Sequence, residues 1–149
     1  MEEEVRHIPC YCRKDRSLLM QVIGKMTFFV VPDFMTHWWT TIGTTIYYPT
    51  SVADPDADSL AGMRAHEMIH VEQWRDHPVC MVLLYLLFPL PVLFSGRWFI
   101  ERSAYLLDIL AGRYSVDRAV EDIWSSYLWP WPRLLMRRWF EAKTFRRMT

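Results

Sequence analysis

The sequence predicts one domain over residues 1–149, with a mostly helical α+β fold and a short β-sheet. Three observations predict this fold. Residues 38–48 are dense in β-branched and aromatic side chains, which favour strands. Helical segments follow from about residue 60 to the C-terminus. Hydrophobic residues make up 52% of the chain and aromatic residues 15%, so there is enough apolar side chain to build a core.

The strands are expected in the first half of the chain, after a helical or irregular lead-in over residues 1–25. Residues 25–31 are β-prone and end at Pro32. Residues 38–48 (WWTTIGTTIYY) predict one or two strands with a kink near Gly43, because glycine interrupts the regular packing of a strand.

A loop and then a series of helices are expected from residue 49 onward. The loop covers the proline- and aspartate-rich residues 49–59, and Asp56, Asp58 or Ser59 is expected to cap the helix that follows. That helix should end before Pro78, since proline disfavours a helical residue in front of it. The predicted helices cover about residues 60–76, 79–88, 97–113, 116–128 and 133 onward.

Charge and cysteine content exclude several classes of protein. The formal net charge is zero, so nucleic acid is not an expected partner. Cys10, Cys12 and Cys80 lack the spacing of a disulfide framework or a zinc knuckle, which predicts free thiols in a reducing compartment. The start Met-Glu-Glu-Glu-Val lacks the basic and apolar regions of a signal peptide, so a cytoplasmic or particle-associated protein is expected.

Residues 66–70 spell H-E-x-x-H within the helix predicted over residues 60–76. Positions i and i+4 share a helical face, so His66 and His70 can bind one metal ion. Glu67 can serve as the base for a water molecule that the metal activates. Three fixed residues in five positions are a modest signal, and a surface helix with two solvated histidines would match it as well.

A catalytic zinc ion needs a third protein ligand. The candidates are His77, Asp76, Glu72, Glu101 and Asp108. Glu72 points away from His70, and His77 lies two turns further along the helix, which disfavours both. Asp76 fits a longer motif, H-E-x-x-H-x-x-G-x-x-[HD], but Gln73 stands where that motif needs glycine for its turn. Glu101 shares a helical face with Tyr105 and Asp108.

The combination of His66-Glu67-x-x-His70 with Glu101-x-x-Ala104-Tyr105 resembles the gluzincin class of zinc metallopeptidases, in which two histidines come from one helix and a glutamate from the next. It is especially similar to the small bacterial and phage members, the minigluzincins, whose motif often continues as H-V-x-Q, as it does here at residues 70–73. The resemblance covers about residues 40–108. It implies a zincin-like domain in which the edge strand of the sheet precedes the H-E-x-x-H helix and pairs with an extended substrate.

The resemblance also implies the chemistry. His66, His70 and Glu101 would hold Zn²⁺, and Glu67 would be the general base of a peptidase that acts on a peptide or protein substrate. Thermolysin-like members carry aspartate four residues after the ligand glutamate, and this chain has Tyr105 there. Either Asp108 takes the place of that aspartate as the partner of a histidine, or Tyr105 is an oxyanion donor.

Two other classes of function stay open. In one, the chain is a structural or interaction protein, such as a component of a phage particle, that keeps a zincin fold and a metal site without turnover. In the other, it is a membrane-associated protein with an incidental H-E-x-x-H. The second class arises from residues 79–94, which contain no charge and raise the question of a membrane span.

A shared metal would limit how residues 79–94 can fold, because both ends of this apolar run would have to return to one place. Pro89 and Pro91 also break a straight helix. We therefore expect residues 79–88 to form a buried helix that is followed by a turn at the two prolines. A hairpin that dips into a membrane is the alternative.

Residues 130–149 form a basic aromatic tail, in which tryptophan and phenylalanine alternate with arginine. Such a pattern suits contact with a protein assembly or with an anionic membrane surface, as a peripheral association. The simpler interpretation is a terminal helix that packs its aromatic side chains on the domain and leaves a solvated basic face.

Overall fold

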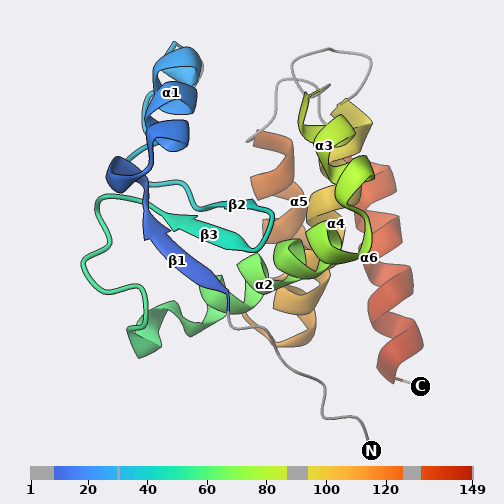
Figure 1. Cartoon of the computed structure of the whole chain (residues 1–149). Helices are drawn as coiled ribbons and strands as arrows, with labels where there is room; N and C mark the ends of the chain where they lie inside the picture. Colours follow the sequence, from blue (N-terminus) through green and yellow to red (C-terminus); the bar gives the residue numbers. More distant parts are fainter. Residues whose placement is uncertain (1–8, 30, 87–93, 126–131, 149) are drawn as a thin grey trace, which may run out of the picture. The chain divides into compact units, whose positions relative to one another are not determined.

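The computed structural model describes residues 9–29, 31–86, 94–125 and 132–148 (Figure 1). It confirms a mostly helical α+β fold with a small sheet. By its internal contacts the chain divides into two compact units, Met1–Arg75 and Asp76–Thr149. The elements are β1 (Cys10–Arg13), the 3₁₀ turn η1 (Lys14–Arg16), α1 (Leu18–Thr27), β2 (Thr40–Ile42), β3 (Thr45–Tyr48), the 3₁₀ turn η2 (Asp58–Leu60), α2 (Ala61–Asp76), α3 (Pro78–Leu86), α4 (Phe94–Leu110), α5 (Val116–Ser125) and α6 (Arg133–Met148).

The sheet of the first unit has the strand order β1-β3-β2, with β1 parallel and β2 antiparallel to β3. A two-residue turn joins β2 to β3, and its first residue, Gly43, has a φ of 61°. This conformation is open to glycine and strained for most other residues, so the expected interruption at Gly43 is confirmed as a hairpin turn. Because β3 is central, the sequence-predicted edge strand around residues 41–46 divides in two. Thr41 lies in an edge strand and Ile46 in the centre.

The expectations for the N-terminal region are met only in part. The helical lead-in expected over residues 1–25 is present in η1 and in the first turns of α1, but β1 is a strand within the same range. Among the β-prone residues 25–31, those that the structure describes do not form a strand, because α1 continues through Thr27 and the amide of Val31 still bonds to the Thr27 carbonyl. The Ser17 side chain accepts a hydrogen bond from the amide of Met20 and so caps α1, which starts the helix that the β-prone residues extend.

The helix α2 follows its prediction closely, and Asp76 ends it before Pro78. The expected side-chain cap is not formed at η2, the 3₁₀ turn that leads into α2. Ala57 occupies the N-cap position of that turn without a side-chain hydrogen bond, and its carbonyl accepts the amide of Leu60 instead. The tighter hydrogen bonding of the 3₁₀ turn thus satisfies backbone groups at this end.

A fully buried lysine lies in the first unit. The Lys14 side chain has no exposed surface, and its ammonium donates to the Phe34 carbonyl at 2.7 Å while lying 3.4 Å from the centre of the Phe34 ring. Burial lowers the pKa of Lys14 to about 7, and the negative charge of Glu67 acts in the opposite direction. Lys14 therefore lies close enough to Glu67 for their charges to interact.

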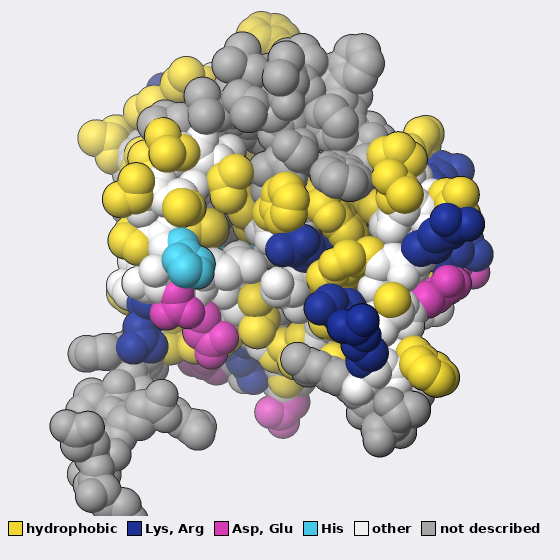
Figure 2. Space-filling model, turned by 90° about the vertical axis from the view of Figure 1, so that its right-hand side faces the viewer, with side chains coloured by type: hydrophobic (Ala, Val, Ile, Leu, Met, Phe, Trp, Pro, Cys, Tyr) yellow, Lys and Arg dark blue, Asp and Glu magenta, His cyan; other side chains and the backbone are white. Residues whose placement is uncertain are grey.

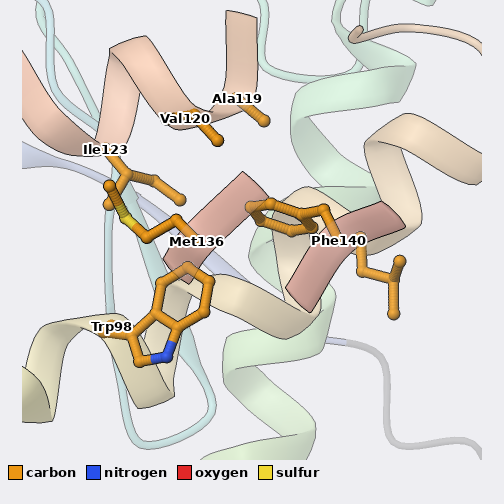
Figure 3. Packing of buried hydrophobic residues seen from close by; sticks show 7 residues of the cluster. Trp98, Ala119, Val120, Ile123, Met136 and Phe140 are labelled. Atoms are coloured by element: carbon orange, nitrogen blue, oxygen red, sulfur yellow. The ribbon is translucent and has the colours of Figure 1, made fainter. Parts of the chain in front are cut away.

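The core of the second unit is built by α4, α5 and α6. Figure 3 shows the buried side chains of α5 and α6 facing Trp98 of α4, whose ring lies 5.6 Å from the ring of Phe140 in an edge-to-face arrangement. The core residues are Trp98, Leu106, Ala119, Val120, Ile123, Met136 and Phe140. The helices predicted over residues 97–113, 116–128 and from 133 onward correspond to these three elements.

The apolar helix predicted over residues 79–88 is present as α3, which begins with Pro78 at a position that tolerates proline well. Its expected burial is wrong for most of the side chains that the structure describes in it. Met81 is buried, but Val79, Val82 and Leu83 are between 43% and 71% exposed. The turn expected at Pro89 and Pro91 lies outside the described residues. Among the residues that are described, none of the helices combines the length and the apolarity that a membrane crossing needs.

The C-terminal helix α6 packs two of its aromatic side chains, Trp139 and Phe140, into the core of the second unit, which agrees with the simpler interpretation of the tail. Phe140 is fully buried, and two arginines of α6 form ion pairs with α5: Arg137 with Asp117 at 2.7 Å, and Arg133 with Glu121 at 3.0 Å. The side of the molecule that carries α6 also presents basic and apolar side chains next to each other (Figure 2). Three large apolar side chains of α6 contribute to exposed surface: Leu134, Leu135 and Phe145.

Candidate metal centre

The two histidines of the motif lie one helical turn apart on α2. The centres of the His66 and His70 rings are 5.3 Å apart, and the ring planes are inclined by 73°. His70 is 4% exposed and His66 is half-buried. This spacing is the one that the helical repeat dictates for positions i and i+4, and it brings two nitrogen ligands to one side of the helix.

Glu101 of α4 joins these histidines. The candidate ligand atoms of His66, His70 and Glu101 all lie within 4.8 Å of one another, so the group could hold a metal ion. Glu101 is 3% exposed, and a carboxylate at this depth is normally stabilised by partner groups or by a metal. The other candidates for the third ligand, among them Asp76 and Asp108, do not belong to this group.

Another residue of α2 contacts one of the candidate ligands. The Nδ1 atom of His70 lies 3.0 Å from Oε1 of Gln73, on the next turn. A carbonyl oxygen only accepts hydrogen bonds, so this contact favours the tautomer with the hydrogen on Nδ1, which leaves the lone pair of Nε2 for a metal. Gln73 is thus a hydrogen-bond partner of His70, the role for which the sequence offered Asp108. Its position three residues after His70 was a signal that could have identified it.

Replacing Gln73 by leucine should weaken the affinity of the candidate metal site for added Zn²⁺ by about ten- to a hundred-fold, because the imidazole of His70 loses an acceptor that favours its orientation and its tautomer. The Gln73→Glu variant keeps an acceptor at the same place and should bind zinc at least as tightly as the unmodified protein. Competition titration with a zinc-sensitive dye measures both affinities. Equal affinities of the leucine variant and the unmodified protein would contradict this role.

The motif glutamate, Glu67, is hydrogen-bonded to a residue of the sheet. Glu67 is 6% exposed, and its Oε2 accepts a hydrogen bond of 2.6 Å from the hydroxyl of Thr41, which lies in β2. The sequence did not identify Thr41, because 26 residues separate it from Glu67 and only the tertiary fold brings the two together.

Tyr105 and Asp108 have structural partners in the second unit. The ring of Tyr105 packs edge-to-face on Tyr114 at 5.6 Å, against the core of the second unit. The buried carboxylate of Asp108 accepts from the Arg113 guanidinium, with the shorter contact at 2.8 Å. An ion pair with Arg113 explains why Asp108 tolerates burial without serving as a ligand. That the Tyr105 hydroxyl stabilises an oxyanion stays a prediction.

The edge strand β2 is covered at its centre. Ile42 and Thr45 close the hairpin as a hydrogen-bonded pair, so at the next position the backbone groups of Thr41 point away from β3. The outward carbonyl of Thr41 accepts a 3.1 Å hydrogen bond from Nε1 of Trp74 on α2. A peptide that pairs with this edge would therefore meet the indole of Trp74 at the Thr41 carbonyl.

Comparison of the chain with protein-family models, with curated proteins and with solved structures gives no match.

Proposed function

We propose that the protein is a zinc-dependent peptidase. The observation that supports this most is the grouping of His66, His70 and Glu101, with the motif glutamate Glu67 buried on the same helix as the two histidines. Two imidazole nitrogens and one carboxylate oxygen are a ligand set typical of a catalytic zinc ion, and they leave a fourth position for water or substrate.

Each residue of the proposed site has a separate role in amide hydrolysis. Zinc, when bound, supplies a Lewis acid that activates water and polarises the substrate carbonyl. Glu67 takes a proton from the attacking water while the water oxygen bonds to the amide carbon of the substrate. Glu67 then passes this proton to the leaving nitrogen as the C–N bond breaks. Tyr105 is proposed to donate a hydrogen bond to the oxygen that becomes negative. An extended peptide could pair with the centre of β2 only after the indole of Trp74 released the Thr41 carbonyl, so we do not propose that β2 aligns the substrate.

The test starts from protein that is purified without added zinc. Metal analysis should find about one zinc ion per chain, and a peptide library should be cleaved. A chelator should abolish cleavage, and added zinc should restore it. Bound zinc without cleavage of any peptide would contradict a peptidase and favour the interaction protein with a zincin fold, for which the exposed apolar and basic face of α6 offers a contact surface.

The His66→Ala variant should lose both the metal and the cleavage, because two protein ligands hold a catalytic zinc ion far more weakly than three. The matched control is His77→Ala, which removes an exposed imidazole just after the end of α2 and should retain both properties. Metal analysis of the two variants side by side gives the comparison. Stoichiometric zinc in the His66→Ala variant would show that the ligand assignment is wrong.

A further inference from the structure

Thr41 stands out as a polar residue that is buried in the short edge strand β2. Its exposed fraction is 1%, and its hydroxyl donates to Oε2 of Glu67 at 2.6 Å. This distance is within the range of hydrogen bonds between a hydroxyl and an ionised carboxylate, which are shorter and stronger than bonds between neutral groups. The contact joins the sheet to the one carboxylate of α2 that the hydrolysis uses as a base.

The hydroxyl of Thr41 is itself held in a fixed place. Thr41 lies opposite Ile46 in the register of the sheet, and its outward carbonyl accepts a hydrogen bond from the indole of Trp74. Trp74 lies seven residues, or two turns, after Glu67 on the same face of α2. Thr41 is therefore hydrogen-bonded to two residues of α2, Glu67 and Trp74. Its β-branched side chain also has little freedom to rotate about its first side-chain bond.

A carboxylate that is held at one oxygen presents the other oxygen in a defined direction. A threonine hydroxyl has a single hydrogen to donate, and in this structure it is aimed at Oε2. We propose that Thr41 is a positioning residue, whose hydroxyl holds Oε2 of Glu67 so that Oε1 is directed at the attacking water. This role rests on the proposed peptidase function and adds to it a residue outside the H-E-x-x-H motif.

The test compares Thr41→Val, which keeps the shape and loses the hydroxyl, with Thr41→Ser, which keeps the hydroxyl. In the zinc-loaded protein, Thr41→Val should lower kcat about ten- to a hundred-fold, because a general base that is slightly displaced from the attacking water transfers protons slowly. KM and zinc content should stay near those of the unmodified protein. Thr41→Ser should recover most of kcat. Equal losses in both variants, or an unchanged kcat in Thr41→Val, would overturn the proposal.

A second measurement separates positioning from a general structural effect. In a Glu67→Gln background there is no base left to position, so adding Thr41→Val should cause little further loss of the residual rate. A full additional loss would show that Thr41 acts through the fold or the metal and would overturn its positioning role. Absence of hydrolysis by the zinc-loaded unmodified protein would overturn the peptidase function, and the role of Thr41 with it. Hydrolysis that is insensitive to Thr41→Val would overturn the role of Thr41 alone.

Discussion

Replacing Glu67 by glutamine should lower peptide hydrolysis by about a hundred- to ten-thousand-fold while zinc remains bound. Glutamine has nearly the same shape as glutamate, and its side-chain oxygen can still accept the hydrogen bond from Thr41. It cannot take a proton from water at neutral pH, so the chemical step loses its base. The three proposed ligands His66, His70 and Glu101 are untouched.

The measurement is kcat and KM on one cleaved peptide, together with the zinc content of the same preparation. Glu72→Gln is the matched control, because Glu72 is an exposed glutamate on the same helix and its replacement removes the same charge. The control should keep the activity of the unmodified protein. Undiminished hydrolysis by the Glu67→Gln variant would rule out the proposed mechanism, whereas loss of zinc in that variant would show that Glu67 also supports the ligands.

The stability of the protein should rise between about pH 7 and pH 10 through Lys14, and the Lys14→Met variant should lack this rise. The lysine is fully buried, and burial lowers its pKa from 10.5 to about 7. Below pH 7 both the folded and the unfolded chain carry the proton, so the cost of burying the charge is present in full. Between the two pKa values the folded chain has released the proton and the unfolded chain still binds it.

The sign of the pH dependence follows from this difference. The unfolded state binds more protons in that window, so the free energy of unfolding increases with pH until the unfolded lysine also titrates. A shift of this size corresponds to roughly 3 to 5 kcal/mol over the window, which is a large part of the stability of a small domain. The neutral amine can still donate to the Phe34 carbonyl, so the hydrogen bond survives the loss of charge.

Urea unfolding of the unmodified protein and of the Lys14→Met variant, at several pH values between 6 and 10, tests this expectation. The difference between the unmodified protein and the Lys14→Met variant isolates the contribution of Lys14, because all other titrating groups are shared. Lys14→Met should be the more stable form at pH 6, and the advantage should shrink as the pH rises. Lys25→Met removes an exposed lysine of α1 and is the control. Its free energy of unfolding should change with pH in parallel with that of the unmodified protein. Parallel profiles of the Lys14→Met and unmodified forms would contradict the prediction.

Local sequence patterns predict the parts of this fold that are formed by local contacts. Helix α2 is predicted nearly with its observed bounds, from the spacing of His66 and His70 and from the position of Pro78. The β2–β3 hairpin is predicted from the β-branched residues around Gly43. Glu101 could be selected as the candidate third ligand because a catalytic zinc ion needs three protein ligands and the resemblance to gluzincins indicates where the third one lies.

The features that the sequence does not predict depend on contacts between distant segments. The strand β1 has only four residues, and it forms because β3, more than 30 residues later, offers a parallel partner. The hydrogen bond between Thr41 and Glu67 has no local signal for the same reason. Burial of α3 was overestimated because an apolar run shows that a helix can be buried, and only its neighbours decide which of its sides is covered.

The hydrogen bond from Trp74 to the Thr41 carbonyl has a consequence for self-association. Edge strands with open backbone groups can pair with the same strand of another molecule, and soluble proteins commonly block such edges. In β2 the outward carbonyl at the centre of the strand is already used by the indole on α2. The contact that ties α2 to the sheet therefore also protects the chain against edge-to-edge aggregation, and it does so with a neutral aromatic side chain rather than with a charge.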